Sequence, residues 1–202
     1  MIAKPAEETP LIAAEAVRLL HEAGVAPDGL QLMPGAGDVG AALVADPRVQ
    51  GVVFTGSTPV ARLIEKELAG RLTRRGAPLA LIAETGGLNA LVVDSSALPE
   101  QVVADVISSA FDSAGQRCSA LRILCLQDDV ADRMLKMLKG AMAELEVGDP
   151  RKLSVDVGPV ITPEARHTIV THIEAMARRG HRVTQTPLGE AVPMTRSSMQ
   201  AT

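Results

Sequence analysis

Short apolar runs alternate with amphipathic segments at helical spacing along most of this chain, and this alternation is the strongest constraint on its fold. Gly, Pro, Ser and Asp bound many of the segments, as is typical of strand and helix ends. The predicted strands cover residues 30–33, 49–54, 78–83, 90–93 and 121–126. The predicted helices cover residues 10–23, 39–44, 57–68, 99–111, 130–145 and 163–179. Strands that alternate with helices in this way predict an α/β fold with a parallel sheet.

The composition excludes several classes of function. The 202 residues are 47% hydrophobic, which is enough to build a core in one or two domains. A formal net charge of -4 and an aromatic content of 1% argue against a nucleic-acid partner. Two cysteines, without metal-ligand spacing to the four histidines, predict neither a disulfide framework nor a metal site. The sequence shows no leader and no membrane-spanning run, so the cytoplasm is the expected compartment.

One cysteine, Cys118, follows the predicted helix 99–111 in a turn that contains Gly115. A thiol at the end of an element, beside Arg117 and free backbone N–H groups, can react as the thiolate. A free cysteine is more often a small buried hydrophobe, and this segment alone leaves that alternative open. The other cysteine, Cys125, lies inside an apolar strand, where we expect a position in the core.

A carboxylate upstream strengthens the case for a reactive thiol. Glu84 ends a predicted apolar strand, and the double glycine Gly86-Gly87 follows it closely. This is a position from which a carboxylate can reach a site at the end of a strand. The alternative is a solvated glutamate at a strand end.

Two glycine-containing turns are candidates for holding a nucleotide. Gly35, Gly37 and Gly40 fit the fingerprint G-x-G-x-x-G between a strand and a helix. No acidic residue follows about twenty residues later to hold a ribose, so a plain tight turn is at least as good an interpretation. The turn Phe54-Thr55-Gly56-Ser57 precedes a second helix, whose free N–H groups can bind a phosphate. A plain helix N-cap at Ser57 is the alternative there.

Four motifs together resemble those of the aldehyde dehydrogenase superfamily. They stand in the family's order, as Lys4-Pro5-Ala6-Glu7, Phe54-Thr55-Gly56-Ser57, Glu84-Thr85-Gly86-Gly87 and Gly115-Gln116-Arg117-Cys118. Within the family, residues 94–127 are most similar to the L-glutamate-γ-semialdehyde (Δ1-pyrroline-5-carboxylate) dehydrogenase part of the bifunctional bacterial proline utilization A proteins. The similarity covers residues 1–185. It implies a partial aldehyde-dehydrogenase-like α/β fold, with parallel sheets and flanking helices.

The resemblance also implies a domain organisation. Residues 1–83 would form part of an NAD-binding domain, and residues 84–185 part of the catalytic domain. Members of the family are much longer, so we expect this chain to be a fragment of a homo-oligomeric parent that is fused to a proline dehydrogenase domain. Residues 186–202 lose all periodicity and are rich in Pro, Ser, Thr and Met, which predicts a disordered tail.

By the same resemblance, individual residues take roles in NAD-dependent oxidation of an aldehyde. Cys118 would be the nucleophile and Glu84 the general base for water, while Ser119 would hydrogen-bond the α-carboxylate of the substrate. The residues that would contact NAD are Lys4, Glu7, Gly37, Phe54, Thr55, Gly56, Ser57, Thr85 and Gly86. The family's asparagine that completes the oxyanion site would lie upstream of Met1. The alternative to a dehydrogenase fragment is an inactive truncated product that at most binds a nucleotide or partner chains.

Overall fold

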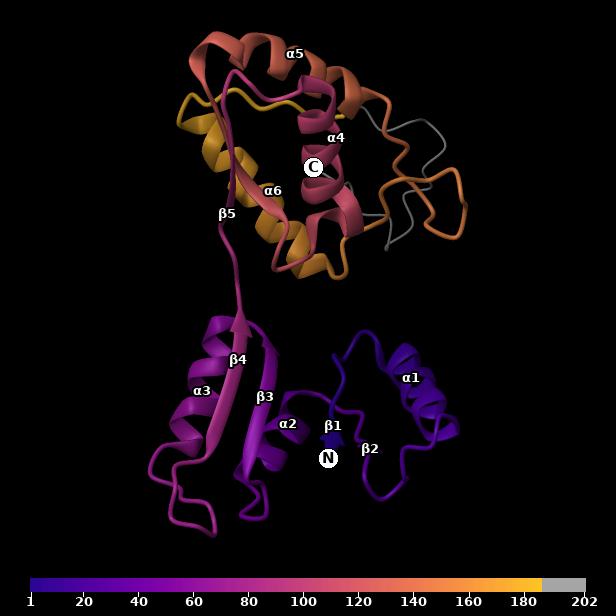
Figure 1. Ribbon diagram of the computed structural model, residues 1–202, viewed down its shortest axis with the longest axis vertical. Helices are drawn as coiled ribbons and strands as arrows, with labels where there is room; N and C mark the ends of the chain where they lie inside the picture. Colours follow the sequence, from indigo (N-terminus) through magenta and orange to yellow (C-terminus); the bar gives the residue numbers. More distant parts are fainter. Residues whose placement is uncertain (187–202) are drawn as a thin grey trace. The chain divides into compact units, whose positions relative to one another are not determined.

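The computed structural model describes residues 1–186, and the chain forms two compact units that divide between Gly86 and Gly87 (Figure 1). The division lies close to the predicted domain boundary, and the assignment of a cofactor domain and a catalytic domain to these units stays a prediction. Of the predicted disordered tail, only Thr186 lies within the described residues. Its hydroxyl donates a hydrogen bond to the carbonyl of Met142 at 3.0 Å.

The first unit holds two pairs of parallel strands and three helices. In each pair the partners run in the same direction, β1 with β2 and β3 with β4. Helix α3 packs against β3 and β4, and α2 packs against α3 (Figure 1). The elements are β1 (Ile2–Ala3), α1 (Pro10–Glu22), β2 (Gln31–Leu32), α2 (Gly37–Ala45), β3 (Gly51–Gly56), α3 (Thr58–Leu68) and β4 (Ala80–Thr85).

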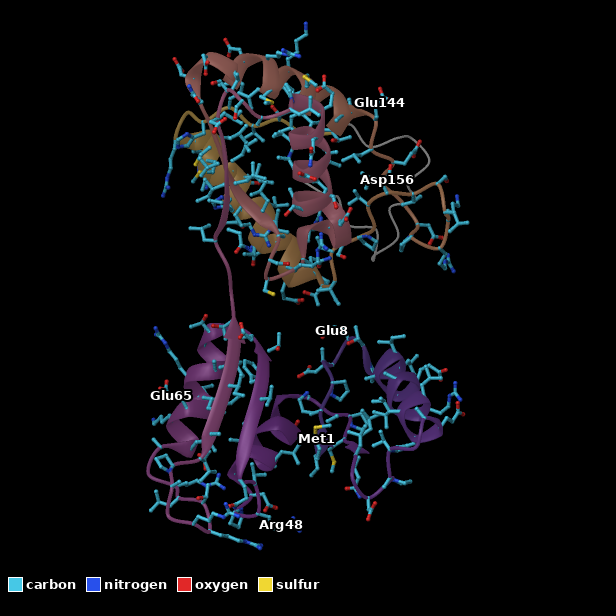
Figure 2. All side chains as sticks on the ribbon, in the orientation of Figure 1. Met1, Glu8, Arg48, Glu65, Glu144 and Asp156 are labelled. Carbon is cyan, nitrogen blue, oxygen red and sulfur yellow. The ribbon has the colours of Figure 1, made fainter. Side chains whose placement is uncertain are left out.

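Helix α3 shows how the sequence sets an element and its buried face. Ser57 is the N-cap, and its Oγ accepts a hydrogen bond from the backbone N–H of Val60 at 3.4 Å. The helix then buries Ala61, Ile64 and Leu68, which recur at intervals of three and four residues. Charged residues occupy the other side, and Figure 2 shows the labelled Glu65 pointing away from β4. The predicted phosphate-binding turn therefore joins strand β3 to a capped amphipathic helix.

The second unit packs two helices on a further pair of parallel strands. Strands β5 and β6 pair in parallel, and α4 and α5 pack against each other and against β6. Its buried apolar residues are Val93, Val106, Ala120, Leu121, Met134, Val157 and Val160. The elements are β5 (Asn89–Val93), α4 (Pro99–Phe111), the short 3-10 helix η1 (Asp112–Gly115), β6 (Leu121–Leu126), α5 (Asp128–Ala143) and α6 (Pro163–Arg178).

Each predicted strand and helix has a counterpart, and the α/β class with parallel strands is confirmed. The strands of the described residues form three separate parallel pairs, however, whereas the alternation alone suggested one sheet. Each longer pair leaves one face open. Val53 and its register partner Ile82 are 79% and 57% exposed on the face opposite α3. An apolar strand in this chain is thus covered on one side only.

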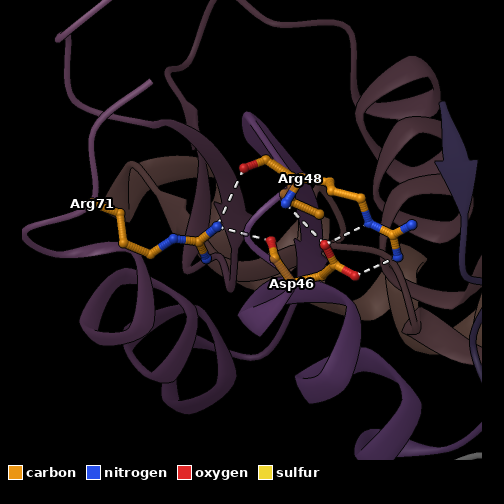
Figure 3. A network of polar contacts seen from close by, with 4 residues as sticks. Asp46, Arg48 and Arg71 are labelled. Atoms are coloured by element: carbon orange, nitrogen blue, oxygen red, sulfur yellow. Dashed lines mark hydrogen bonds and ion pairs between the residues drawn. The ribbon is translucent and has the colours of Figure 1, made fainter. Parts of the chain in front are cut away.

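A cluster around Arg71 fixes the segment between α2 and β3 (Figure 3). The Arg71 guanidinium donates hydrogen bonds to the carbonyls of Val44 at 2.5 Å, Asp46 at 2.9 Å and Val49 at 3.3 Å. The Asp46 carboxylate is paired with the side chain of Arg48 at 2.6 Å. This side-chain contact, together with the backbone N–H of Arg48, lowers the pKa of Asp46 to about 2. One arginine therefore satisfies three carbonyls at the end of α2 and in the loop after it.

We expect Arg71→Ala to destabilise the chain, because it leaves three carbonyls of a half-buried loop without their donor. Losses of this kind cost about 1–3 kcal/mol. Arg71→Lys should recover only part of the loss, since an ammonium cannot reproduce the planar fork. The free energy of unfolding in urea, followed by circular dichroism, measures both. Arg75→Ala, which alters an exposed arginine in the turn before β4, is the matched control, and an equal loss there would contradict the prediction.

Candidate active site

The segment around Cys118 leaves α4 through a turn with an uncommon backbone. Ser113, Ala114 and Gly115 have φ values of 56°, 54° and 66°, so three successive residues lie in the left-handed region. Only glycine adopts this region without steric cost, so the turn is held by its surroundings. Cys118 follows three residues later and is exposed. The structure therefore presents this thiol to solvent, and the alternative of a buried cysteine is wrong for Cys118, whereas its reactivity stays a prediction.

The arginines near Cys118 hold the backbone of the turn. Arg117 lies beside Cys118 in sequence, but its guanidinium donates to the Ser108 carbonyl at 2.9 Å and lies 3.7 Å from the Asp112 carboxylate. Arg122 donates to the carbonyls of Gly115 at 2.7 Å and Arg117 at 3.3 Å. The sequence predicted that the positive charge of Arg117 would lie beside the Cys118 thiol. In the structure the Arg117 guanidinium is directed toward α4 and η1.

Gln116 ties the turn to a distant stretch of the chain. Its Oε1 accepts from the backbone N–H of Ile161 at 2.6 Å, and its Nε2 donates to the carbonyls of Ser113 at 2.9 Å and Pro159 at 3.5 Å. On the other side, Asn89 donates to the carbonyl of Cys118. Sequence reasoning assigned no role to either amide. A polar residue two positions after the double glycine, at the start of an apolar strand, was the available signal for Asn89.

The predicted general base and phosphate-binding turn share one end of the β3–β4 pair in the first unit. Glu84 is the register partner of Thr55, and Thr85 is the partner of Gly56. Glu84 is exposed, and Gly86 follows with φ 61°, a left-handed conformation that favours glycine. Because the strands are parallel, these residues lie at the same carboxyl edge. Glu84 belongs to the first unit, and Cys118 belongs to the second.

Lys4 joins the glycine-rich turn that precedes α2. Its Nζ donates to the carbonyls of Pro5 and Gly35, each at 2.8 Å. An ammonium has three protons, so one remains for another acceptor. A Cβ on Gly35 would lie 2.4 Å from Cγ2 of Val39, whereas one on Gly37 would meet nothing within 4 Å. Gly35 is therefore required by the tight turn, and Gly37 borders open space.

Two further predicted residues lie at exposed positions. Glu7 is in a turn before α1, and Ser119 follows Cys118 directly. The expectation that Cys125 is a core residue is wrong, because Cys125 is exposed. Its register partner Val92 is also 80% exposed, and both lie on the face of β5–β6 opposite α4 and α5. The helices α4 and α5 cover only one face of this apolar strand pair, so the residues of its other face are exposed.

No helix among the described residues is both long and apolar enough to cross a membrane.

The sequence matches known proteins along nearly its whole length. The model of the aldehyde dehydrogenase family matches residues 1–195. The bifunctional protein PutA of Escherichia coli (strain K12) is 60% identical over 186 residues, which are 92% of this chain and 14% of that protein. The 1-pyrroline-5-carboxylate dehydrogenase of Geobacillus kaustophilus is 36% identical over 189 residues, covering 91% of this chain and 36% of that enzyme.

Solved structures agree with these matches. A variant of Bradyrhizobium japonicum proline utilization A is 53% identical with a TM-score of 0.85, covering 94% of this chain and 19% of that one. The 1-pyrroline-5-carboxylate dehydrogenase from Thermus with bound NAD is 32% identical with a TM-score of 0.81, covering 98% and 38%. The chain spans less than two fifths of the length of each of these four relatives. It belongs to the aldehyde dehydrogenase family.

Proposed function

We propose that this chain is the thiol-bearing and cofactor-binding part of a dehydrogenase that oxidises L-glutamate γ-semialdehyde to L-glutamate with NAD, in the breakdown of proline. The observation that carries the proposal is an exposed cysteine in a tightly held turn, in a chain 60% identical to a bifunctional PutA protein. The 36% identity to a 1-pyrroline-5-carboxylate dehydrogenase supports the same substrate. The free thiols of both cysteines favour a cytoplasmic location. A fused proline dehydrogenase domain and a homo-oligomer stay predictions.

The reaction uses Cys118 as the nucleophile. Its thiolate adds to the aldehyde carbon and gives a thiohemiacetal, whose hydride leaves to give a thioester. Water then attacks the thioester, with Glu84 accepting its proton, and releases the acid and the free thiol. The backbone N–H of Cys118 donates to the oxygen that becomes negative during both additions. Ser119, the next residue, would hold the α-carboxylate through its hydroxyl.

The residues of the first unit fit NAD, which when bound accepts the hydride. The N-terminus of α3 presents free N–H groups at Ser57 and Thr58, both exposed, and these suit a pyrophosphate. Lys4 keeps one ammonium proton for a ribose hydroxyl after its two bonds to carbonyls. The open space beside Gly37 admits the adenosine end. Glu7, Phe54, Thr55, Gly56, Thr85 and Gly86 complete the proposed cofactor residues.

The thiol chemistry can be tested with the chain itself, because it holds two exposed cysteines. We expect iodoacetamide to alkylate both exposed thiols, and L-glutamate γ-semialdehyde to slow the alkylation of Cys118 alone. The physical reason is that only Cys118 forms a reversible adduct with the aldehyde. Peptide mass spectrometry at timed intervals measures both rates in the same sample. Equal protection of the two thiols, or protection of neither, would contradict the proposed nucleophile.

A further inference from the structure

Asn89, at the first position of β5, makes two hydrogen bonds to the segment that contains Cys118. Its Nδ2 donates to the carbonyl of Cys118 at 2.8 Å and to the carbonyl of Ala120 at 2.9 Å. Carbonyl oxygens only accept, so the NH2 group of the amide must be the one that faces them. The two bonds fix the Cys118–Ser119 and Ala120–Leu121 peptide groups, and Ser119 lies between these two carbonyls in the sequence.

The backbone of Gly87 packs closely against the same carbonyl group of Cys118. A Cβ at this position would lie 2.1 Å from the carbonyl oxygen of Cys118 and 3.3 Å from its carbon. No side chain fits there, so Gly87 is needed for the approach of the two backbone segments. A Cβ would also lie 3.1 Å from Nδ2 of Asn89. Gly87 and Asn89 therefore both contact one atom, the carbonyl oxygen of Cys118.

The contact also sets the direction of the neighbouring N–H group. In a trans peptide the carbonyl of one residue and the N–H of the next point in opposite directions. With the Cys118 carbonyl directed at Asn89, the N–H of Ser119 points away from Asn89. On the far side, the N–H of Leu121 donates to Oγ of Ser109 on α4 at 3.2 Å. The segment from Cys118 to Leu121 is thus bonded to β5 and to α4.

We propose that Asn89 is a positioning residue for the Cys118 thiol and for Ser119. This inference rests on the proposed function, in which Cys118 attacks the aldehyde and Ser119 holds the α-carboxylate. A nucleophile and a substrate-binding group on adjacent residues must be held in a fixed mutual geometry, and a displacement of about 1 Å can cost about two orders of magnitude in rate. Asn89 supplies that fixation without touching the substrate.

The decisive variant is Asn89→Asp, which keeps the shape of the side chain but replaces the donors with a carboxylate. The carboxylate repels the carbonyls of Cys118 and Ala120 and adds a negative charge near the thiol. We expect alkylation of Cys118 by iodoacetamide at pH 7 to fall about tenfold, with its pH profile displaced to higher pH. Asn89→Ser keeps one donor and no charge, so its profile should stay unshifted. Both variants should weaken protection by L-glutamate γ-semialdehyde, Asn89→Ser by less.

Controls separate positioning from a general loss of structure. Gln127 offers a matched amide at the other end of the β5–β6 pair, where its Oε1 accepts from the backbone N–H of Ser95 at 3.0 Å. Gln127→Ala should leave the pH profile and the protection of Cys118 unchanged. Cys125, which is exposed in the same chain, is the internal reference for the reagent, because its alkylation should keep its rate in the Asn89 variants. Circular dichroism checks the fold of each.

The possible results are distinguishable. An unshifted pH profile and full protection in Asn89→Asp, with the fold intact, would overturn the positioning role. If Asn89→Asp unfolds, Asn89→Ser decides through the protection measurement, and wild-type protection there would likewise overturn it. A wild-type Cys118 that the aldehyde does not protect would instead overturn the proposed function. Protection in the wild type that is lost in the Asn89 variants but kept in Gln127→Ala supports both.

Discussion

Purified alone, the 202-residue chain should produce NADH from L-glutamate γ-semialdehyde at a rate at least about two to three orders of magnitude below that of the Escherichia coli PutA protein. Loss of a single oxyanion donor has an effect of this size, and the resemblance implies that the family's second donor is not among these 202 residues. The chain also matches only 14% of the length of that protein, so much of the substrate pocket would come from other segments. The absorbance of NADH would follow the reaction.

A chimera tests whether the segments outside this chain supply the missing activity. Residues 1–186 of this chain would replace the corresponding 60% identical segment of the Escherichia coli protein. We expect the chimera to be active, and Cys118→Ala within it to lower kcat by at least about four orders of magnitude, because the covalent route is removed. Cys125→Ala is the matched control and should retain activity. Comparable turnover by the isolated chain and the chimera, abolished by Cys118→Ala in both, would show that the remaining segments are dispensable.

Gly56→Val should weaken NAD binding by at least about tenfold, or about 1.4 kcal/mol. Gly56 sits at the end of β3, directly before the N-cap of α3, where a side chain would block the approach of a pyrophosphate to the backbone. The structure adds a second effect, because a Cβ at this position would lie 2.5 Å from Cζ of Phe54. The Phe54 ring would have to rotate, and it is itself a proposed cofactor residue. Calorimetric titration of NAD into both forms measures the change.

The variant Gly37→Ala separates an effect on NAD binding from an effect on the fold. Among the described residues, no atom outside the neighbouring backbone lies within 4 Å of a Cβ at Gly37, so the substitution itself creates no clash. A lower affinity in this variant would report the space that the adenosine end requires. Gly140→Ala, at an equally open position in α5, is the matched control and should bind NAD as the wild type does. Wild-type affinity in both Gly56→Val and Gly37→Ala, with the fold intact, would remove these turns from the cofactor site.

Local sequence signals predicted the elements well where a cap or a proline marks the boundary. Pro10, Ser57, Pro99 and Thr162 stand at or directly before the first residues of helices that the sequence placed. Strand β1 was not predicted, because Lys4 and Pro5 directly follow Ile2–Ala3 and leave an apolar run too short to indicate a strand. Helix η1 was also missed, since its sequence Asp112–Gly115 gives no sign that Ser113 and Ala114 would adopt positive φ.

The positions of the candidate site residues were more predictable than the contacts that support them. The turn position of Cys118 and the carboxyl-edge position of Glu84 follow from the residues before and after them, and the chemistry of both residues stays a prediction. The contact of Asn89 with the Cys118 carbonyl joins residues 29 apart, and no local pattern encodes such a pairing. The misplacement of Cys125 has the same origin. Which face of a strand is covered depends on where distant helices pack, and the sequence of that strand does not record it.

The left-handed turn at Ser113, Ala114 and Gly115 carries a consequence for variation in this chain. Left-handed conformations cost an ordinary residue about 1 kcal/mol or more each, so Ser113 and Ala114 oppose the conformation that their neighbours impose. A library selected only for heat resistance should therefore enrich glycine or asparagine at these two positions. A library selected for turnover need not make the same choice. Glycine or asparagine would make the backbone of the turn more flexible, and the Cys118 thiol would then be held less firmly in its reactive position. Selection for heat resistance and selection for turnover would then favour different residues at positions 113 and 114.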